Sequence, residues 1–265
     1  MSDKPRVRAT CPPSLTARLF SVWYRHFKVY SKNLISNGFP PFLEPLFFLA
    51  GVGLGLGQYV GFIQGSPYVT FLATGIMAPS AMYTATFETT FGTFVRLEFD
   101  KVYDGMVAAS ITPGNLFAGE MLFCGTKGLF FSGAVMSVIY PFGLIPSPMG
   151  LLAPVGGFFT GLMFAALGLY VTSFVTNINH FNFYFTGLVT PMFFFSGIVF
   201  PLDALPMVLR PVAEIMPLTH AARLIRAFCF NRFDLVVLFS VLYMTVFTLA
   251  VGYAAVRRLE KRIIT

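Results

Sequence analysis

Long apolar stretches alternate with short polar ones over most of this 265-residue chain. A helix needs about 20 mostly apolar residues to cross a bilayer. The alternating ten-residue pattern of a membrane β-barrel does not occur, and closed barrels are the only other spanning solution. The pattern therefore predicts an all-α integral membrane protein with six transmembrane helices, near residues 45–59 (extended by 39–43), 68–91, 115–140, 149–174, 183–201 and 235–256.

Composition supports this class. Hydrophobic residues make up 56% of the chain and charged residues 11%, and the mean hydropathy is +0.74. Soluble domains carry roughly 45–50% apolar and about 25% charged residues. So few charges are not enough to cover a globular surface in water, which excludes ordinary soluble, disordered and fibrous proteins. The three cysteines are far apart and form no disulfide or zinc spacing.

Basic residues predict the orientation, because they favour the cytoplasmic side. With the N-terminus inside, the inner segments hold 13 basic residues and the outer loops hold four. This predicts cytoplasmic N- and C-termini, a six-helix domain over residues 39–256 and a basic cytoplasmic tail over 257–265. The net charge of +7 therefore indicates membrane lipid as a partner and not nucleic acid.

The N-terminal 38 residues predict a cytoplasmic basic arm followed by an amphipathic interfacial helix over 15–35. At 100° per residue the apolar stripe of this helix is Leu19, Trp23, Phe27, Tyr30 and Leu34. Nearly opposite lie Arg18, Arg25, Lys28 and Lys32. Such a helix lies in the headgroup plane. It serves either as a plain membrane anchor or as a docking surface for a cytoplasmic partner.

The last outer loop, residues 202–233, is too apolar for a solvated loop. Short helices are expected at 205–209, 212–216 and 221–230, broken by Pro206, Pro211 and Pro217. We expect this segment to re-enter the outer half of the bilayer, where irregular backbone must be buried against protein. Arg223 and Arg226 share a helix face. They line an exit, hold outer-leaflet phosphates or simply snorkel to the interface.

Some ionisable residues fall near or within spans, where such groups are costly and often functional, and three of them form a candidate cluster. Glu120 and Lys127 are seven residues apart on one helix face, and Glu88 is near the inner end of the second span. We expect Lys127 to pair with Glu88 or Glu120, or to face a polar cavity. The group is either a structural ion pair between spans two and three or part of a transport path.

The inner loop 92–113 is the most polar stretch between spans. It carries the charged residues Arg96, Glu98, Asp100, Lys101 and Asp104. Mixed charge on a short helix suits docking to a soluble partner. A solvated connector has the same composition, so both interpretations stand.

Motifs for enzymatic chemistry are lacking. No phosphate-binding G-x-x-x-x-G-K-[ST] motif occurs, and no H-E-x-x-H or G-x-S-x-G. The glycines at 51, 53, 55 and 57 are interpreted as a helix-packing face. The chain is thus expected to be no enzyme, with no catalytic, metal or cofactor site of its own.

Several segments resemble the NodJ-like permeases of the ABC type-2 exporter family. They are FLATGIMAPSAMYTATFET at 71–89, Gly119-Glu120-Met121 with Thr126-Lys127, TPMFFFSGIVFPLDALP at 190–206, PLTH at 217–220 and Leu224-Ile-Arg226. The resemblance covers about residue 45 to the end.

This resemblance implies a half-transporter of the bacterial inner membrane. Two copies would form the channel, and two copies of a separate NodI-like ATPase would supply ATP and Mg²⁺. The inner loop, with Arg25 and Lys28 on the N-terminal helix, would dock the ATPase. The cargo implied is a lipo-oligosaccharide or similar glycolipid, with a polysaccharide, a lipid or a drug-like compound as alternatives.

Under this interpretation the transport path is lined by aromatic faces that suit acyl chains or sugar rings. The candidates are Tyr83, Phe87, Met192, Phe193, Phe194, Phe195, Phe200, Arg223 and Arg226. Most of these rings face lipid or neighbouring helices in the simpler interpretation. Other classes are a proton-coupled carrier that uses Glu88, Glu120 and Lys127, a passive channel and a membrane-bound enzyme.

Overall fold

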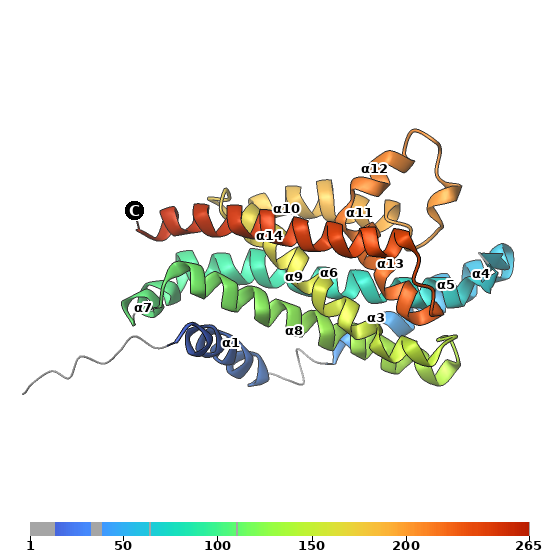
Figure 1. Cartoon of the computed structure of the whole chain (residues 1–265), viewed down its shortest axis with the longest axis horizontal. Coiled ribbons are helices and arrows are strands. Elements are labelled where there is room, and N and C mark those ends of the chain that lie inside the picture. The colour runs from blue at the N-terminus through green and yellow to red at the C-terminus, as the bar shows by residue number, and fades with distance from the viewer. Residues whose placement is uncertain (1–13, 33–38, 64, 110, 265) are drawn as a thin grey trace, which may run out of the picture.

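The structure is a computed structural model that describes residues 14–32, 39–63, 65–109 and 111–264. Its long helices run side by side along the longest axis of an elongated molecule (Figure 1). Residues 1–13 of the expected basic arm, and Leu34 of the expected amphipathic stripe, lie outside the described residues.

Three of the described helices are long and apolar enough to cross a membrane. They are α8 (Pro113–Ile139), α9 (Ala153–Thr172) and α14 (Leu235–Ile264), and they match the third, fourth and sixth expected spans. The short 3-10 helices η4 (Tyr140–Phe142) and η5 (Pro148–Leu152) connect α8 to α9. None of these three helices has a proline beyond its first turn, so the hydrogen-bond ladder of each is uninterrupted.

The segments of the other expected spans consist of shorter helical pieces. The first comprises α3 (Pro40–Phe48), π-helical η1 (Leu49–Leu54) and α4 (Gly55–Val60). The second comprises α5 (Tyr68–Gly75), α6 (Met77–Phe87) and π-helical η2 (Glu88–Gly92). The fifth comprises α10 (Phe181–Tyr184), π-helical η7 (Phe185–Val189) and α11 (Thr190–Phe195), after the 3-10 turn η6 (Ile178–His180). The break between α5 and α6 falls just before Pro79, which has no N–H to continue the ladder.

The connecting segments form the two ends of the molecule. At one end lie α1 (Leu15–Ser31), π-helical η3 (Val95–Phe99), α7 (Val102–Ala108) and the C-terminal end of α14 (Figure 1). At the other end lie α4, a hairpin of β1 (Phe62–Ile63) and β2 (Ser66–Pro67), η8 (Leu202–Ala204), α12 (Arg210–Ile215) and α13 (Pro217–Phe230). The hairpin is antiparallel and pairs Phe62 with Pro67, a feature that the sequence interpretation did not include.

The expectation of a helix at 205–209 is wrong. Residues 207–209 form a turn, residues 205 and 206 are not helical, and helix resumes only at Arg210. Pro211 and Pro217 stand in the first turns of α12 and α13, where proline is tolerated because its missing N–H has no partner there. These two prolines therefore begin helices, and only Pro206 lies in the segment that lacks one.

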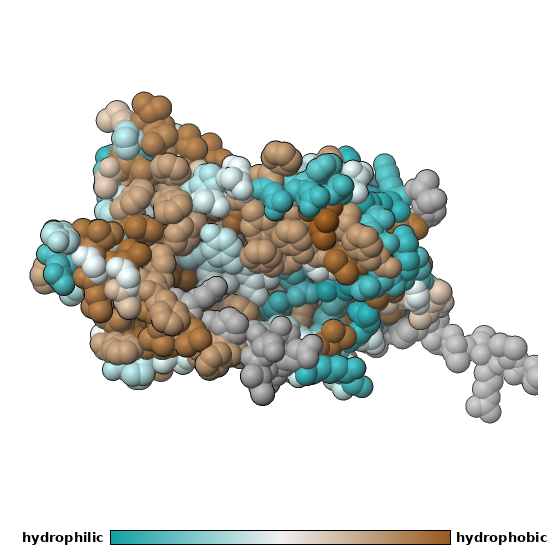
Figure 2. Space-filling view, turned by 180° about the vertical axis from the view of Figure 1, so that it is seen from behind, coloured by the Kyte–Doolittle hydropathy of each residue, from teal (hydrophilic) through white to brown (hydrophobic). Residues whose placement is uncertain are grey.

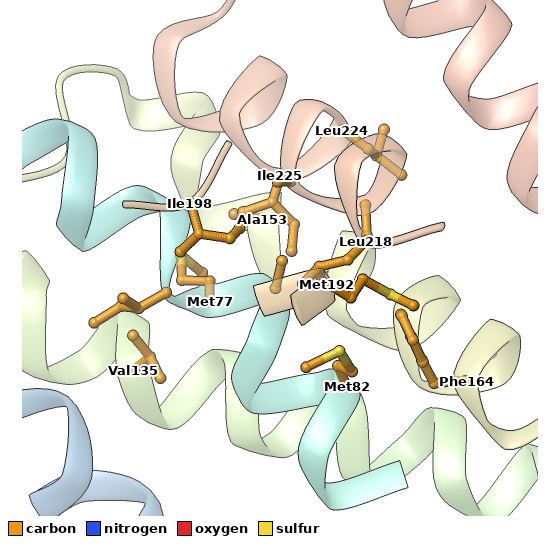
Figure 3. Packing of buried hydrophobic residues seen from close by; sticks show 14 of the residues in the cluster. Met77, Met82, Val135, Ala153, Phe164, Met192, Ile198, Leu218, Leu224 and Ile225 are labelled. Atoms are coloured by element: carbon orange, nitrogen blue, oxygen red, sulfur yellow. The ribbon is translucent and has the colours of Figure 1, made fainter. Parts of the chain in front are cut away.

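The main core lies where α6, α8, α9 and α13 meet. Figure 3 shows Met77 and Met82 of α6, Phe164 of α9 and Ile225 of α13 within the same cluster of hydrophobic side chains, and all four are fully buried. Methionine is flexible enough to fill the irregular space between crossing helices. This core holds α13 against the long helices and so fixes the end of the molecule that carries α12.

The space-filling view separates the two kinds of surface. Figure 2 shows hydrophilic side chains gathered mainly toward the end that carries α7 and the end of α14, while apolar side chains cover much of the rest of that face. Many exposed side chains of α14 are large and apolar, including Leu238, Phe239, Leu242 and Leu249. An apolar exterior of this extent is expected where lipid is the solvent.

Glycines set the contact between α8 and α9. A Cβ on Gly128 would lie 3.0 Å from the Cα of Gly161, and one on Gly161 would lie 2.6 Å from the carbonyl oxygen of Cys124. Backbone atoms cannot move aside as a flexible side chain can. Small residues at this crossing therefore allow the two backbones to touch.

We predict that Gly128→Ala destabilises the protein by about 1–3 kcal/mol, because the methyl group overpacks a backbone contact. Gly133→Ala on the same helix is the matched control, since its Cβ would meet only Pro154 at 3.8 Å. Thermal unfolding of the detergent-solubilised protein measures both. Equal midpoints for the two variants would contradict the proposed crossing.

Candidate functional site

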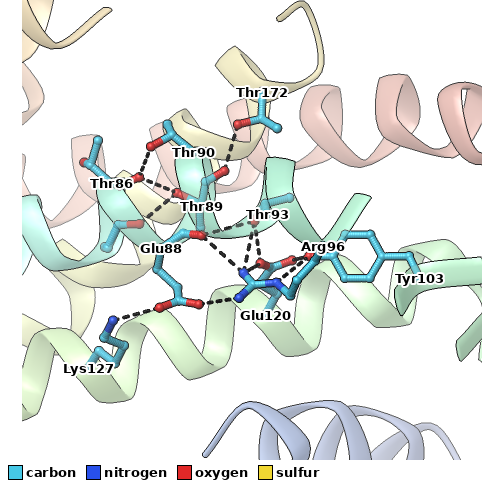
Figure 4. A network of polar contacts seen from close by, with 11 residues as sticks. Thr86, Glu88, Thr89, Thr90, Thr93, Arg96, Tyr103, Glu120, Lys127 and Thr172 are labelled. Carbon is cyan, nitrogen blue, oxygen red and sulfur yellow. Dashed lines mark hydrogen bonds and ion pairs between the residues drawn. The ribbon is translucent and has the colours of Figure 1, made fainter. Parts of the chain in front are cut away.

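Four charged side chains from two parts of the chain meet at the polar end of the bundle. Glu88 begins η2, Arg96 lies on η3, and Glu120 and Lys127 lie on α8. Figure 4 shows them pointing toward one another between the two helical segments. Two carboxylates face two cations, so the formal charge of the cluster is balanced. We call these four residues the charge network.

Glu88 joins the two cations. Its Oε1 accepts a hydrogen bond from Nη1 of Arg96 at 2.6 Å, and its Oε2 lies 2.8 Å from Nζ of Lys127. The expected pairing of Lys127 with one of the two glutamates is thereby confirmed. Both side chains of this pair are only 12–15% exposed, which makes the pairing necessary in a poorly hydrated site.

Arg96 is the centre of the network. Its Nη2 donates to Oε1 of Glu120, a residue with no exposed surface, and its Nε donates to the hydroxyl of Tyr103 at 3.1 Å. The Tyr103 hydroxyl in turn donates to Oε2 of Glu120 at 2.9 Å, and the Thr93 hydroxyl donates to Oε1. Arg96 therefore connects η2, η3, α7 and α8 through one planar group.

Two π-helical turns bring these residues into place. Glu88 and Arg96 lie on η2 and η3, and a π-helix leaves backbone groups out of the normal hydrogen-bond ladder. The Thr172 hydroxyl of α9 donates to the carbonyl of Thr89 at 2.8 Å and so satisfies one of them. Gly168 gives the close approach that this contact needs, because a Cβ there would collide with the Thr89 side chain.

Helix α1 packs across α8 beside the charge network. The indole Nε1 of Trp23 donates to the Thr126 hydroxyl at 3.0 Å, and a Cβ on Gly119 would lie 2.7 Å from the Cβ of Val22. The ring of Tyr30 lies 5.0 Å from Nζ of Lys127, a distance that allows a cation–π interaction. Helix α1 thus contacts Lys127 of the charge network, so a change in the position of α1 changes the surroundings of this lysine.

The residues expected to dock an ATPase fall into two groups. Asp100, Lys101, Asp104 and Lys28 are exposed and Arg25 is half-buried. Arg96 instead lies inside the charge network. Glu98 pairs with Arg262 at 2.8 Å and, more weakly, with Lys101 at 3.9 Å, which ties η3 to the end of α14.

Sequence reasoning missed Tyr103, Thr93 and Arg262 as members of this region. A phenol seven residues after Arg96 in a polar loop gives no signal of its own, because only the fold brings it to Glu120. Among the described residues, no group of three or more potential metal ligands is present.

The expected path residues do not form one group. Tyr83 and Phe193 have ring centroids 6.3 Å apart, whereas Phe87 stacks on Phe185 at 4.6 Å. Met192 is fully buried in the core, and Phe194 is exposed. Phe195 and Phe200 are half-buried. Arg223 pairs with Glu214 and, like Arg226, lies at the far end of the molecule.

Comparison with known proteins identifies the family. The sequence model of the ABC-2 type transporter matches residues 17–230. The chain belongs to the ABC-2 type transporter family. It is therefore a membrane component of a transporter, and the resemblance found in the sequence is confirmed.

Curated relatives are similar to this ABC-2 transporter over most of its length. Nodulation protein J of Sinorhizobium fredii is 34% identical over 245 residues, which cover 92% of this chain and 94% of the relative. Nodulation protein J of Rhizobium leguminosarum bv. viciae is 36% identical, over 78% of this chain and 80% of the relative. Nodulation protein J of Bradyrhizobium diazoefficiens is 31% identical, over 84% of this chain and 86% of the relative.

We predict that Lys127→Met destabilises the transporter by about 3 kcal/mol or more, because it leaves the buried Glu88 carboxylate with one cation fewer. The double variant Glu88→Gln/Lys127→Met should lose less stability than the sum of the losses in Glu88→Gln and Lys127→Met. Lys101→Met is the control, since Lys101 is 59% exposed and its ion pair is long. Additive effects in thermal unfolding would argue against a coupled pair.

Helix α1 should undock in acid. His26 is 3% exposed and stacks on Phe123, and burial lowers its pKa to about 4 from 6.5. The docked helix thus binds fewer protons than the undocked one, so docking weakens as the pH falls from about 6.5 toward 4. Trp23 is the only tryptophan and contacts α8, so its emission should shift to longer wavelength at pH 5.

The variant His26→Phe separates this effect from other titrations. It keeps a ring against Phe123 but has no proton to bind. The emission of Trp23 should then be independent of pH between 5 and 8. The same shift in both proteins would exclude His26 as its cause.

Proposed function

We propose that the chain is the permease half of an ATP-driven exporter. Two copies form the membrane path, and two copies of a separate NodI-like ATPase bind on the side of α7. In this arrangement both termini are cytoplasmic and the membrane is the bacterial inner membrane. ATP and Mg²⁺ are bound by the partner, and this chain transmits its movement.

The observation that carries the proposal is a continuous connection from an exposed polar surface to the membrane helices. Asp100, Lys101 and Asp104 are exposed around the start of α7, and Tyr103 on the same helix is buried against Glu120. A partner that pushes on α7 therefore acts on the charge network directly. Exposed charges beside a buried anchor suit a docking segment.

The charge network suits the transmission step. Arg96 and its two carboxylates tie the inner loop to α8, and the ion pair between Glu88 and Lys127 ties η2 to the same helix. Buried ion pairs have discrete geometries because their partners cannot separate without a large desolvation cost. Movement of the inner loop is thus passed on to α6 and α8 as a unit.

The cargo in this proposal is an amphipathic glycolipid or lipo-oligosaccharide, which follows the family resemblance. Apolar and aromatic surface around Tyr83, Phe193 and Phe48 suits acyl chains or sugar rings. A second copy of this chain would complete the path. The glycines at 51 and 55 have open space for such a neighbour, since a Cβ there would meet no described atom within 4 Å.

Co-purification with a NodI-like ATPase tests the proposal. The charge reversals Asp100→Lys and Asp104→Lys should lower the recovered ATPase about tenfold, as expected when like charges replace a complementary pair. The matched control is Asp203→Lys, an exposed carboxylate at the opposite end of the molecule.

Export and ATP hydrolysis should fall together in the loop variants while membrane insertion stays unchanged. Unchanged recovery of the ATPase in both variants would remove the docking assignment. Transport by the purified chain alone would overturn the proposal as a whole and favour a proton-coupled carrier.

A further inference from the structure

A cavity of about 610 Å³ opens at the end of the molecule opposite the charge network. It lies between α5, the segment after α11, α13 and the start of α14. Apolar side chains form part of its wall, including Phe71, Phe230, Val236 and Val237. Four arginines form much of the rest: Arg210, Arg223, Arg226 and Arg232. A wall of this mixed character suits a ligand with a charged and an apolar part.

Arg226 is held at this wall by neutral groups only. Its Nη1 donates to the carbonyl of Gly197 at 2.7 Å, and its Nη2 donates to the carbonyls of Phe71 and Ile198 at 3.1 and 3.2 Å. The guanidinium also lies 3.8 Å from the centroid of the Phe71 ring. None of the ion pairs formed by the described residues includes Arg226, so its charge is not balanced by a carboxylate.

The hydrogen-bond capacity of Arg226 is also incompletely used. A guanidinium has five N–H donors, and the three bonds to carbonyls use three of them. The Nε atom is buried and has no partner among the described residues. Charges with little contact to water are normally paired, so a site for an anion next to this group accounts for the missing countercharge.

The charged residues that line the cavity do not cancel one another, and an anion would balance the remaining positive charge. Arg223 forms two hydrogen bonds with the carboxylate of Glu214, and Arg210 donates to the carbonyls of Leu205 and Asp203. Arg232 is exposed at the rim. The carboxylates of Asp203 and Asp234 also line the cavity, so arginines exceed carboxylates by one, four against three.

We propose that this cavity binds the phosphate or sulfate ester of an amphipathic molecule, with the anion between Arg226 and Arg232 and its apolar part along Phe71 and Phe230. Guanidinium groups match the geometry of such anions with paired donors. Arg223 is excluded as the main ligand because both of its Nη atoms already donate to the carboxylate of Glu214. The inference goes beyond the proposed function, since it requires neither an ATPase nor a particular cargo.

The probe is dihexanoyl phosphatidic acid added to the full-length protein in neutral detergent. Its binding should raise the thermal midpoint in a concentration-dependent way. Dihexanoylglycerol, which lacks the phosphate, and inorganic phosphate, which lacks the chains, should each give a much smaller rise. Equal rises with dihexanoylglycerol and phosphatidic acid would overturn the proposal.

The variant Arg232→Gln should weaken phosphatidic acid binding about tenfold, the loss expected for one charge-assisted hydrogen bond. Its fold is not at risk, because the side chain is exposed. The matched control Arg257→Gln removes an exposed arginine from the opposite end and should bind as the unaltered protein does.

Gly75→Ala tests Arg226 without removing its charge. A Cβ at this position would lie 2.6 Å from Nη2 of Arg226, so the guanidinium must shift and binding should weaken. Arg226→Gln should abolish binding if the variant folds. Unchanged affinity in both Arg232→Gln and Gly75→Ala would overturn the site even if Arg226→Gln cannot be purified.

Two sources of the anion are then separable. The protein is extracted from cells with its surrounding lipid in polymer nanodiscs, and the lipid is analysed. More anionic phospholipid with the unaltered protein than with Arg232→Gln assigns the site to membrane lipid. Equal lipid content, with phosphatidic acid binding still sensitive to Arg232, assigns it to the transported molecule. Because no step depends on ATP, failure of the ATPase co-purification does not affect this result.

Discussion

Arg96 shares its guanidinium between two carboxylates in a region that water hardly reaches, and much of the polar end of the molecule is arranged around this contact. Glu120 has no exposed surface, so its charge is tolerable only beside a cation. The inner loop must return to the bundle to supply that cation, and the π-helical turns of η2 and η3 carry the chain there. The position of α7 follows from the same requirement through Tyr103.

The two ends of the molecule handle buried cations in different ways. At the polar end, Arg96 and Lys127 face carboxylates, and the charges balance within the protein. At the other end, Arg226 faces backbone carbonyls and an aromatic ring. The first arrangement is complete and suits a group that holds moving parts together. The second leaves Arg226 without a carboxylate partner in the wall of an open cavity, and suits contact with something outside the chain.

Between these ends, small residues rather than polar ones determine the packing. Gly128 and Gly161 let α8 and α9 touch, and Gly119 lets α1 lie directly on α8. In lipid there is no hydrophobic drive to bring helices together, so close backbone contact supplies much of the attraction. The helix that bears Glu120 and Lys127 is consequently held from two sides, by α9 and by α1. A force applied to the charge network acts on this packed unit.

The membrane class, the three long helices and the pairing of Lys127 could be predicted from the sequence, because apolar length and the cost of an unpaired charge act locally along the chain. It also indicated the family through the segments around Thr89 and Pro201. The folded chain alone shows that Arg96 lies in the charge network and not on the loop surface, that Tyr103 completes the network, and that residues 206–209 are not helical. These outcomes depend on contacts between residues far apart in the chain, which no local pattern of hydrophobicity or charge encodes.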